Sequence, residues 1–406
     1  MSETQSSYRV ALLFNANKIY DREIITGIGD YLRSTRTGWD LFLEEDYRCR
    51  LNGIERWQGH GIIADFDDPE VSAALARSQL PVVAVGGSYA DESDYPDKVP
   101  YVATDNFKLV KLALDHLIES GLQRFACFSL PAAPTNRWAQ EREKAFEFRM
   151  RQEGLECHIY RGEKTYAPSW ETTVRQQMEW LQSLPKPIGI VAVTDARALQ
   201  LLQACLSADI AVPEQVALIG IDNDPLARTL TRIPLSSVAQ GTHEMGMTAA
   251  HLMHRMLHGV QLDPTRIVIP PAGINVMASS RHEPANHPYV MKARHFIRLH
   301  ACHGIRTEQV ADYVGVSRSS LEMYFRRSRG HSVHDEILHF KLAAAQQLLR
   351  DENLSIAEIA IRCGFSSMQY MHAVFKRELG CTPRGYQEQL ALSSDEPAHP
   401  LNETGQ

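Results

Sequence analysis

Long hydrophobic runs are missing from this sequence of 406 residues. No stretch approaches the roughly 18 consecutive apolar residues that a membrane-spanning helix needs. The N-terminal segment reaches only five apolar residues in a row, from Val10 to Phe14, which is too short for the apolar core of a secretory signal peptide. We therefore expect a cytoplasmic protein without a membrane partner. A secreted binding protein, which would need a signal peptide, is disfavoured.

Cysteine is sparse as well. The seven cysteines are odd in number and form no Cys-x-x-Cys pair, a pattern typical of reduced thiols in a reducing compartment. The nearest approach to a metal-ligand cluster is Cys302 between His300 and His303, and a zinc site needs four well-spaced ligands. We therefore expect no metal site and no cofactor.

Catalytic signatures are also missing. No Gly-x-Ser-x-Gly, His-Glu-x-x-His or Walker phosphate loop occurs. Asp65, Asp67 and Asp68 form a carboxylate cluster that a glycosidase would also display, but adjacent Asp67 and Asp68 before Pro69 are typical of a turn. The sequence thus predicts binding without turnover, not an enzyme. Product formation from pentoses would support the glycosidase alternative.

The charges are unevenly distributed. Hydrophobic residues make up 44% of the chain and charged residues 22%, as in globular proteins of two or three domains. The net charge is −7, yet residues 288–392 carry 14 Lys and Arg against 10 Asp and Glu, whereas residues 1–287 carry 28 against 36. A mildly basic C-terminal part on an acidic body indicates a nucleic-acid-binding module there.

Residues 1–280 alternate between short apolar runs and amphipathic stretches. Continuous runs of Val, Ile and Leu indicate strands covered on both faces, and strand–helix alternation predicts parallel sheets. We expect an α/β fold of two Rossmann-like subdomains. The expected strands are residues 10–14, 61–65, 82–85, 124–129, 189–193 and 216–221.

The pattern changes near residue 280. Residues 275–288 are polar and contain prolines, so we place a linker at 281–290. The apolar period then becomes helical, which predicts an all-α domain at 291–392 after an N-terminal domain at 1–280. Residues 393–406 have no periodic apolar face and are expected to be a disordered tail.

The C-terminal part contains an internal repeat. Residues 311–327 and 360–377 share Ala-x-x-x-Gly, a following serine, and an apolar stripe that ends in Phe and two basic residues. A glycine accepts the left-handed conformation that ends a helix, and serine caps the next one, so each copy predicts a helix-turn-helix motif. The glycines are Gly315 and Gly364, and the capping serines are Ser317 and Ser366 with Ser367.

A helix at residues 333–350 would join the two motifs and let them address major-groove segments about 34 Å apart. A plain helical bundle is the alternative, which the basic ends of both second helices disfavour. The expected inward-facing residues are Val314, Leu321, Tyr324, Phe325, Ile359, Met371, Val374 and Phe375.

Residues 288–392 resemble the AraC/XylS-type DNA-binding domain, most clearly over residues 355–377 and in Gly380, Thr382, Pro383 and Tyr386. Gln387 stands where that pattern usually has Arg. The resemblance implies readers of base edges and anchors for phosphates on double-stranded DNA. The base-edge candidates are Ser319, Glu322, Met323, Met368, Gln369, His372 and Ala373. The phosphate candidates are Arg318, Arg326, Arg327, Lys376, Arg377 and Arg384.

Polar residues follow the predicted strands of the N-terminal part, where open α/β sheets bind ligands. Trp138 and Arg142 are four residues apart at a helix start and share one face. Carboxylates, amides and an Arg suit hydroxyl groups, and an aromatic face suits a sugar ring. The candidate ligand-binding residues are Asp65, Ser88, Tyr89, Trp138, Arg142, Thr194, Asp195, Asp222 and Asn223.

The same part resembles the ligand domain of LacI/GalR regulators and periplasmic binding proteins. The similar segments are residues 102–106, 116–126, 142–146, 212–222 and 234–240. The resemblance implies that Arg142 and Asp222 contact sugar hydroxyls, with Thr194 and Asp195 nearby. The chain departs from that family because no helix-turn-helix precedes Tyr8.

A LacI-like ligand domain followed by an AraC-like DNA-binding domain resembles a family of bacterial transcription regulators that respond to D-xylose. The resemblance covers residues 8–392 and implies D-xylose as effector, a homodimer on promoter direct repeats, and activation through RNA polymerase. A response to another pentose, or action as a repressor, is the alternative.

Overall fold

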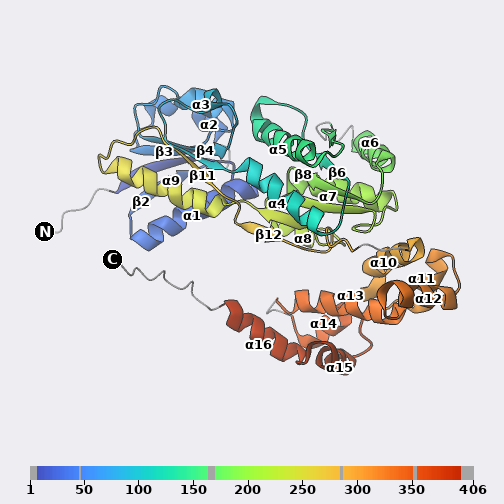
Figure 1. Ribbon diagram of the computed structural model, residues 1–406. Coiled ribbons are helices and arrows are strands. Elements are labelled where there is room, and N and C mark those ends of the chain that lie inside the picture. Colours follow the sequence, from blue (N-terminus) through green and yellow to red (C-terminus); the bar gives the residue numbers. More distant parts are fainter. Residues whose placement is uncertain (1–6, 45–46, 163–169, 284–286, 351–353, 395–406) are drawn as a thin grey trace, which may run out of the picture. The chain divides into compact units, whose positions relative to one another are not determined.

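The computed structural model describes residues 7–44, 47–162, 170–283, 287–350 and 354–394. The chain divides into an N-terminal unit, Met1–Glu283, and a C-terminal unit, Pro284–Gln406 (Figure 1). Each unit has its own hydrophobic cores. Among the described residues, no helix combines the length and the apolar character needed to cross a membrane.

The first sheet of the N-terminal unit has six parallel strands in the order β11-β5-β4-β3-β1-β2. The strands are β1 (Tyr8–Leu13), β2 (Trp39–Leu43), β3 (Gly61–Asp65), β4 (Val82–Gly87), β5 (Tyr101–Thr104) and β11 (Arg266–Ile269).

Both faces of the first sheet are covered. Val10 and Leu12 belong to a core with α1 (Ile19–Thr35) and α9 (Thr242–Leu257), which lie side by side in Figure 1. Ala11 and Leu13, which point the other way, belong to a second core that includes Val71 of α3 (Pro69–Leu75) and Ile54 near α2 (Arg48–Leu51). Cover on both faces explains why the strand reads as a continuous apolar run.

The second sheet has the order β12-β10-β9-β8-β6-β7 and is parallel except for the antiparallel pair of β10 and β12. Its strands are β6 (Phe125–Phe128), β7 (His158–Tyr160), β8 (Ile188–Ala192), β9 (Val216–Ile221), β10 (Ser236–Ala239) and β12 (Gly273–Asn275).

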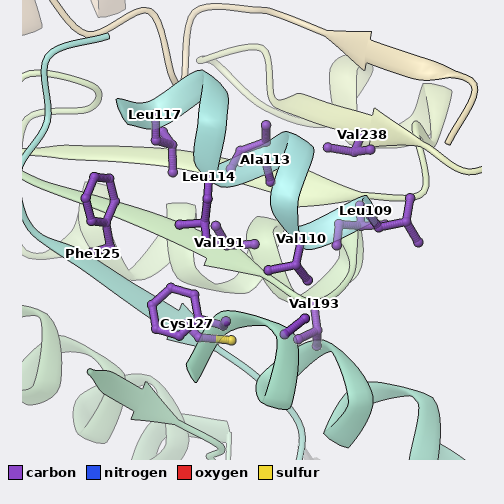
Figure 2. Packing of buried hydrophobic residues seen from close by; sticks show 14 of the residues in the cluster. Leu109, Val110, Ala113, Leu114, Leu117, Phe125, Cys127, Val191, Val193 and Val238 are labelled. Atoms are coloured by element: carbon purple, nitrogen blue, oxygen red, sulfur yellow. The ribbon is translucent and has the colours of Figure 1, made fainter. Parts of the chain in front are cut away.

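Helices α4 (Asn106–Glu119) and α5 (Arg137–Glu153) pack on the second sheet. Figure 2 shows Leu114 of α4 beside Val191 of the strands, and Leu109, Val110 and Phe125 belong to the same core. The remaining helices of this half are α6 (Trp170–Ser183), α7 (Asp195–Ser207) and α8 (Pro225–Thr229).

The chain crosses between the two sheets three times. The crossings follow β5, β10 and β11, and hydrogen bonds join them to one another. Asp105 donates its backbone N–H to the carbonyl of Ile269 at 3.1 Å, and Ala272 donates to the carbonyl of Ala239 at 2.9 Å. Three adjacent connections of a few residues each form a hinge between the two α/β halves.

The C-terminal unit is helical. Its α-helices are α10 (Pro288–His300), α11 (Thr307–Val314), α12 (Arg318–Arg329), α13 (Val333–Leu348), α14 (Ile356–Arg362), α15 (Met368–Leu379) and α16 (Pro383–Ser394). Helix α13 contributes Val333 and Ile337 to the core of the first half, and Leu338, Leu342 and Ala345 to the core of the second. It thereby joins the two halves, as the sequence predicts.

The predicted fold class is confirmed, and the strands it named are present, β3 and β9 with the predicted bounds and the other four with shifted ends. The sequence reading missed β2, β5, β7, β10, β11 and β12. These strands are short or polar, so they lack a continuous apolar run. Helix α10 begins at Pro288, inside the expected linker, and α16 extends to Ser394, inside the expected tail. The rest of that tail, 395–406, lies outside the described residues.

Helices α1 and α9 meet through two glycines, which gives a test of this packing. A Cβ at Gly27 would lie 2.1 Å from the carbonyl oxygen of His243, and one at Gly246 would lie 2.0 Å from that of Ile24. We expect Gly27→Ala to force the backbones apart and lower the free energy of unfolding by about 1–3 kcal/mol in urea denaturation.

Gly29→Ala on the same helix is the matched control, since a Cβ there has no atom within 4 Å. It should raise stability by about 0.5–1 kcal/mol because alanine favours helix. Equal effects at positions 27 and 29 would contradict the close packing.

Candidate functional site

A cleft of about 670 Å³ lies between the two halves of the N-terminal unit. This volume falls within the roughly 300–1,000 Å³ of small-molecule sites. The lining residues come from the carboxyl ends of strands in both sheets, from the N-terminal turns of α1, α5 and α7, and from the crossing after β10. They are Asn17, Lys18, Ile19, Tyr20, Asp65, Asp67, Thr104, Leu130, Trp138, Arg142, Thr194, Ala196, Arg197, Gln200, Asp222, Asp224 and Gln240.

The first sheet contributes two buried carboxylates to the cleft. Asp67 accepts hydrogen bonds from the N–H of Gly87 and from the hydroxyl of Tyr89. Asp65 accepts from the N–H of Asp67 at 2.9 Å and lies 3.9 Å from the ammonium of Lys18. Burial raises the pKa of both carboxyls, that of Asp65 well above its usual range. This wall therefore holds hydrogen-bond acceptors that are poorly solvated.

The second sheet contributes a guanidinium and an indole. Arg142 is 3% exposed, and its Cζ lies 4.8 Å from the centre of the Trp138 ring. Its Nε donates to Asn106 Oδ1 at 2.9 Å, and Asn106 donates its backbone N–H to Ser88 Oγ at 2.9 Å. A Cβ at Gly87 would lie 2.9 Å from Asn106 Nδ2 and 3.0 Å from Trp138 Cβ, so a larger residue there would force these side chains to shift. Arg142 is thus held in place by the hydrogen bond to Asn106 and by the Trp138 ring.

Asp222 lies at the base of the cleft and touches the hinge. Its Oδ1 accepts from Gln240 Nε2 at 2.7 Å, and Thr104 Oγ1 donates to Gln240 Oε1 at 3.1 Å. Asp222 and Asn223 have φ angles of 132° and 57°, conformations that non-glycine residues rarely adopt and that concentrate at functional sites. Burial raises the pKa of Asp222 to about 6, opposed by the positive charge of Arg142.

Asp195 supports the site from behind. It accepts from Ser237 Oγ at 2.6 Å and from the N–H of Asp224 at 2.7 Å, and it does not line the cleft. Burial and the nearby charge of Asp222 raise the pKa of Asp195 to about 8. Its role in the structure is to fix the loop that follows β9.

The nine predicted ligand-binding residues divide into two groups. Asp65, Trp138, Arg142, Thr194 and Asp222 line the cleft. The other four lie beside it: Asp195 behind the loop, Asn223 bonded to Ser237, Ser88 bonded to Asn106, and Tyr89 bonded to Asp67. We therefore describe these four as supporting residues.

Sequence reasoning missed several lining residues. The Asp67-Asp68-Pro69 sequence indicates a turn, and the only functional role it suggests for Asp67 is that of a glycosidase carboxylate, yet Asp67 lines the cleft. Arg197 lies one turn into α7 and stacks 4.2 Å above the Phe128 ring, which no local pattern indicates. Gln240 follows β10, a strand that the sequence reading did not identify. The chemically important additions are Lys18, Tyr20, Asp67, Thr104, Arg197, Gln200 and Gln240.

The cleft can hold a small polyhydroxyl compound. Its carboxylates accept hydrogen bonds, Arg142 and Arg197 donate them, and Trp138 and Tyr20 offer flat apolar surfaces. A sugar presents hydroxyl groups around its edge and C–H groups on its faces, so it matches both features. The bound hydroxyls would take the place of water at the buried carboxylates.

The C-terminal unit contains two helix-turn-helix motifs. Helix α11 ends at Gly315 with φ of 82°, and Ser317 caps α12 by accepting from the N–H of Ser320. In the second motif Gly364 has φ of 69°, and Ser367 caps α15 by accepting from the N–H of Tyr370. The predicted turns are confirmed. The second cap comes from Ser367, whereas Ser366 makes no capping bond in the described part of the chain.

All eight predicted inward-facing residues pack in the cores of the C-terminal unit, with Tyr324 at the margin. The opposite faces of α12 and α15 present the predicted DNA-binding residues. The exposed ones are Arg318, Ser319, Met323, Arg326, Arg327, Met368, Gln369, Ala373, Lys376 and Arg377, and Arg384 is exposed on α16.

Two other candidates are only half exposed. His372 is partly buried. Glu322 accepts from the N–H of Val333 at 3.3 Å, which ties it to the start of α13. Three of the cations already pair with carboxylates: Arg318 with Glu308, Arg377 with Glu378, and Arg384 with Glu388.

Fold and site together define a ligand-binding transcription regulator. Residues 9–107 match the XylR N-terminal domain family, residues 114–280 the periplasmic binding protein-like domain family, and residues 310–389 a helix-turn-helix domain family.

Relatives over nearly the full chain identify the family. The xylose operon regulatory protein of Escherichia coli K12 is 45% identical over 94% of this chain and 97% of its own length. Its counterpart in Haemophilus influenzae is 42% identical over 94% of this chain and 99% of its own length. A solved structure of a xylose-binding transcription activator, XylR, matches with a TM-score of 0.88 and 44% identity over 95% of this chain and 99% of that one.

The chain belongs to the xylose operon regulatory protein family, which confirms the resemblance noted from the sequence. It is a transcription regulator and not an enzyme.

The raised pKa of Asp222 gives a prediction for the sugar-free protein. Because the folded pKa of about 6 exceeds the ordinary 3.8, the ionised carboxylate destabilises the fold above pH 6, and this penalty disappears below about pH 4. Asp222→Asn should therefore raise the free energy of unfolding at pH 7.5, by up to about 3 kcal/mol, and leave it unchanged at pH 4.

Urea denaturation at the two pH values measures this difference. Asp263→Asn, which changes an exposed carboxylate of the same unit, is the matched control. A loss of stability in Asp222→Asn at pH 7.5 would contradict the assignment.

Proposed function

We propose that the protein binds D-xylose in the cleft of the N-terminal unit and that the sugar promotes binding of the C-terminal unit to promoter DNA. The names of the relatives support D-xylose as the sugar. The observation that carries the proposal is the cleft itself, where buried carboxylates and Arg142 meet at a hinge. The same chain carries two helix-turn-helix motifs.

Asp65, Asp67 and Asp222 would accept hydrogen bonds from sugar hydroxyls, while Arg142 would donate to them. The ring would lie against Trp138. Because these groups come from both halves, a bound sugar favours the arrangement in which both walls reach it. Asp222 would report the contact to the hinge through Gln240.

Exposed residues of α12 and α15 would read base edges in the major groove, and the Arg and Lys side chains would hold phosphates. The protein would act in the cytoplasm as a homodimer that binds direct repeats in the promoter. It would activate transcription through contact with RNA polymerase. We also propose the domain limits that the sequence predicts: a ligand-binding domain at 1–280, a linker at 281–290 and a DNA-binding domain at 291–392.

Asp222→Asn should separate sugar sensing from DNA binding. In fluorescence anisotropy with a promoter fragment, we expect D-xylose to tighten DNA binding by the wild-type chain, whereas the variant keeps only the sugar-free affinity. Calorimetry should show that the variant no longer binds D-xylose, since the amide does not supply the same acceptor charge. An unaltered xylose response in Asp222→Asn, with Asp263→Asn as the control, would remove Asp222 from the site.

Substitutions of Gln369 and of Lys376 should have different effects on DNA binding. Gln369→Ala should reduce discrimination between the operator and a single-base variant by about 1–3 kcal/mol, because an amide reads a base edge. Lys376→Ala should weaken binding to all sequences and lower the slope of log affinity against log salt by about 1. Binding curves at several salt concentrations distinguish the two. Identical profiles for the variants would contradict the assigned roles.

A further inference from the structure

Two histidines and a glutamate come together in the C-terminal unit, and none of them is among the predicted DNA-binding residues. His331 lies in the turn between α12 and α13, and Glu336 and His339 lie one turn apart on α13. One ligand atom from each residue lies within 4.8 Å of the ligand atoms of the other two. Sequence reasoning considered instead Cys302 with His300 and His303, and those residues are not part of this group.

Glu336 is buried and uses its two carboxylate oxygens differently. Oε1 accepts from Arg294 Nε at 2.7 Å, and Oε2 faces His331 Nε2 at 3.1 Å. Ligand atoms about 2.05 Å from a tetrahedral zinc ion lie roughly 3.3 Å apart, close to the second distance. The pair Oε2 and Nε2 therefore already has the spacing of one edge of a metal site.

The hydrogen bond on the other side of His331 strengthens this reading. Its Nδ1 lies 3.1 Å from the carbonyl oxygen of Ser332, which only accepts, so Nδ1 carries the hydrogen. Nε2 then faces the carboxylate either as an imidazolium N–H or with its lone pair. In the second case two acceptors face each other, and either a proton on the carboxyl or a metal ion must lie between them. A histidine that donates its second N–H to a carbonyl is the usual arrangement at metal sites.

His339 supplies the third ligand. Its ring centre is 5.2 Å from that of His331, and it is exposed, so its side chain can turn toward the pair. Glu336 and His339 form a Glu-x-x-His pair on one helix face, a spacing that bundle proteins use to bind metals. Three ligands of this type leave a fourth position for water, as in zinc sites with one open position.

We propose that His331, Glu336 and His339 bind a divalent transition metal of the zinc class. On binding, the metal replaces the proton between His331 and Glu336, and that proton leaves to solvent. The ion would attach the turn after α12 to helix α13, and Arg294 would link the same glutamate to α10. The site would thus stabilise the first helix-turn-helix motif independently of the sugar.

The test uses the full chain after treatment with a chelator. Zinc(II) is titrated by calorimetry, and cobalt(II) is added separately to record the visible bands of tetrahedral coordination. We expect His339→Ala to weaken zinc binding by about tenfold or more and to remove the cobalt bands. His334→Ala is the matched control, because His334 is exposed on the same helix and lies outside the group.

His331→Gln should behave like His339→Ala, and it keeps a polar side chain in the turn. A rise in melting temperature with zinc in the wild-type chain and in His334→Ala, but not in His339→Ala, would support the site. A flat zinc isotherm would overturn the proposal, since a proton alone would then lie between His331 and Glu336. Zinc binding that is the same in His339→Ala, His331→Gln and the control would also overturn it.

Discussion

The behaviour of the N-terminal unit depends on poorly solvated carboxylates at the point where its two halves meet. Asp65, Asp67 and Asp222 line the cleft, and burial raises the pKa of each one. An ionised carboxylate without enough donors is unfavourable in such a place. A ligand rich in hydroxyl groups supplies those donors, whereas an apolar ligand of equal size does not. The same desolvation therefore destabilises the sugar-free protein and selects what it binds.

The position of these groups explains how occupancy can change the protein. Asp222, Gln240 and Thr104 form a hydrogen-bonded chain from the cleft into two of the three crossings. Across the cleft, Arg137 of α5 pairs with Asp94 at 2.7 Å and lies over the Tyr89 ring, so the loop after β4 contacts the opposite half. A sugar that bonds to both walls favours the arrangement in which these contacts form. By linkage, any change that this makes in DNA affinity must appear equally in sugar affinity.

The sequence predicted the parts of this fold that depend on local pattern. The buried strands, the glycine-terminated helices and the repeat in the C-terminal unit all follow from runs, spacing and caps. It did not predict β10 or the place of Gln240, because this strand is short and begins with two serines, so it has no continuous apolar run. The local pattern also did not separate Asp222, which faces the cleft, from Asp195, which lies behind it, and only the family resemblance implied that difference. Both residues follow buried strands, and the three-dimensional hydrogen bonds distinguish them.

The central claim is that the sugar cleft and the DNA-reading helices are energetically linked. The most direct measurement is the affinity for D-xylose by calorimetry, with and without a saturating promoter fragment, set beside the affinity for that fragment with and without D-xylose. The account predicts that DNA tightens xylose binding by the same factor by which xylose tightens DNA binding. A xylose affinity that is unchanged by DNA would contradict it.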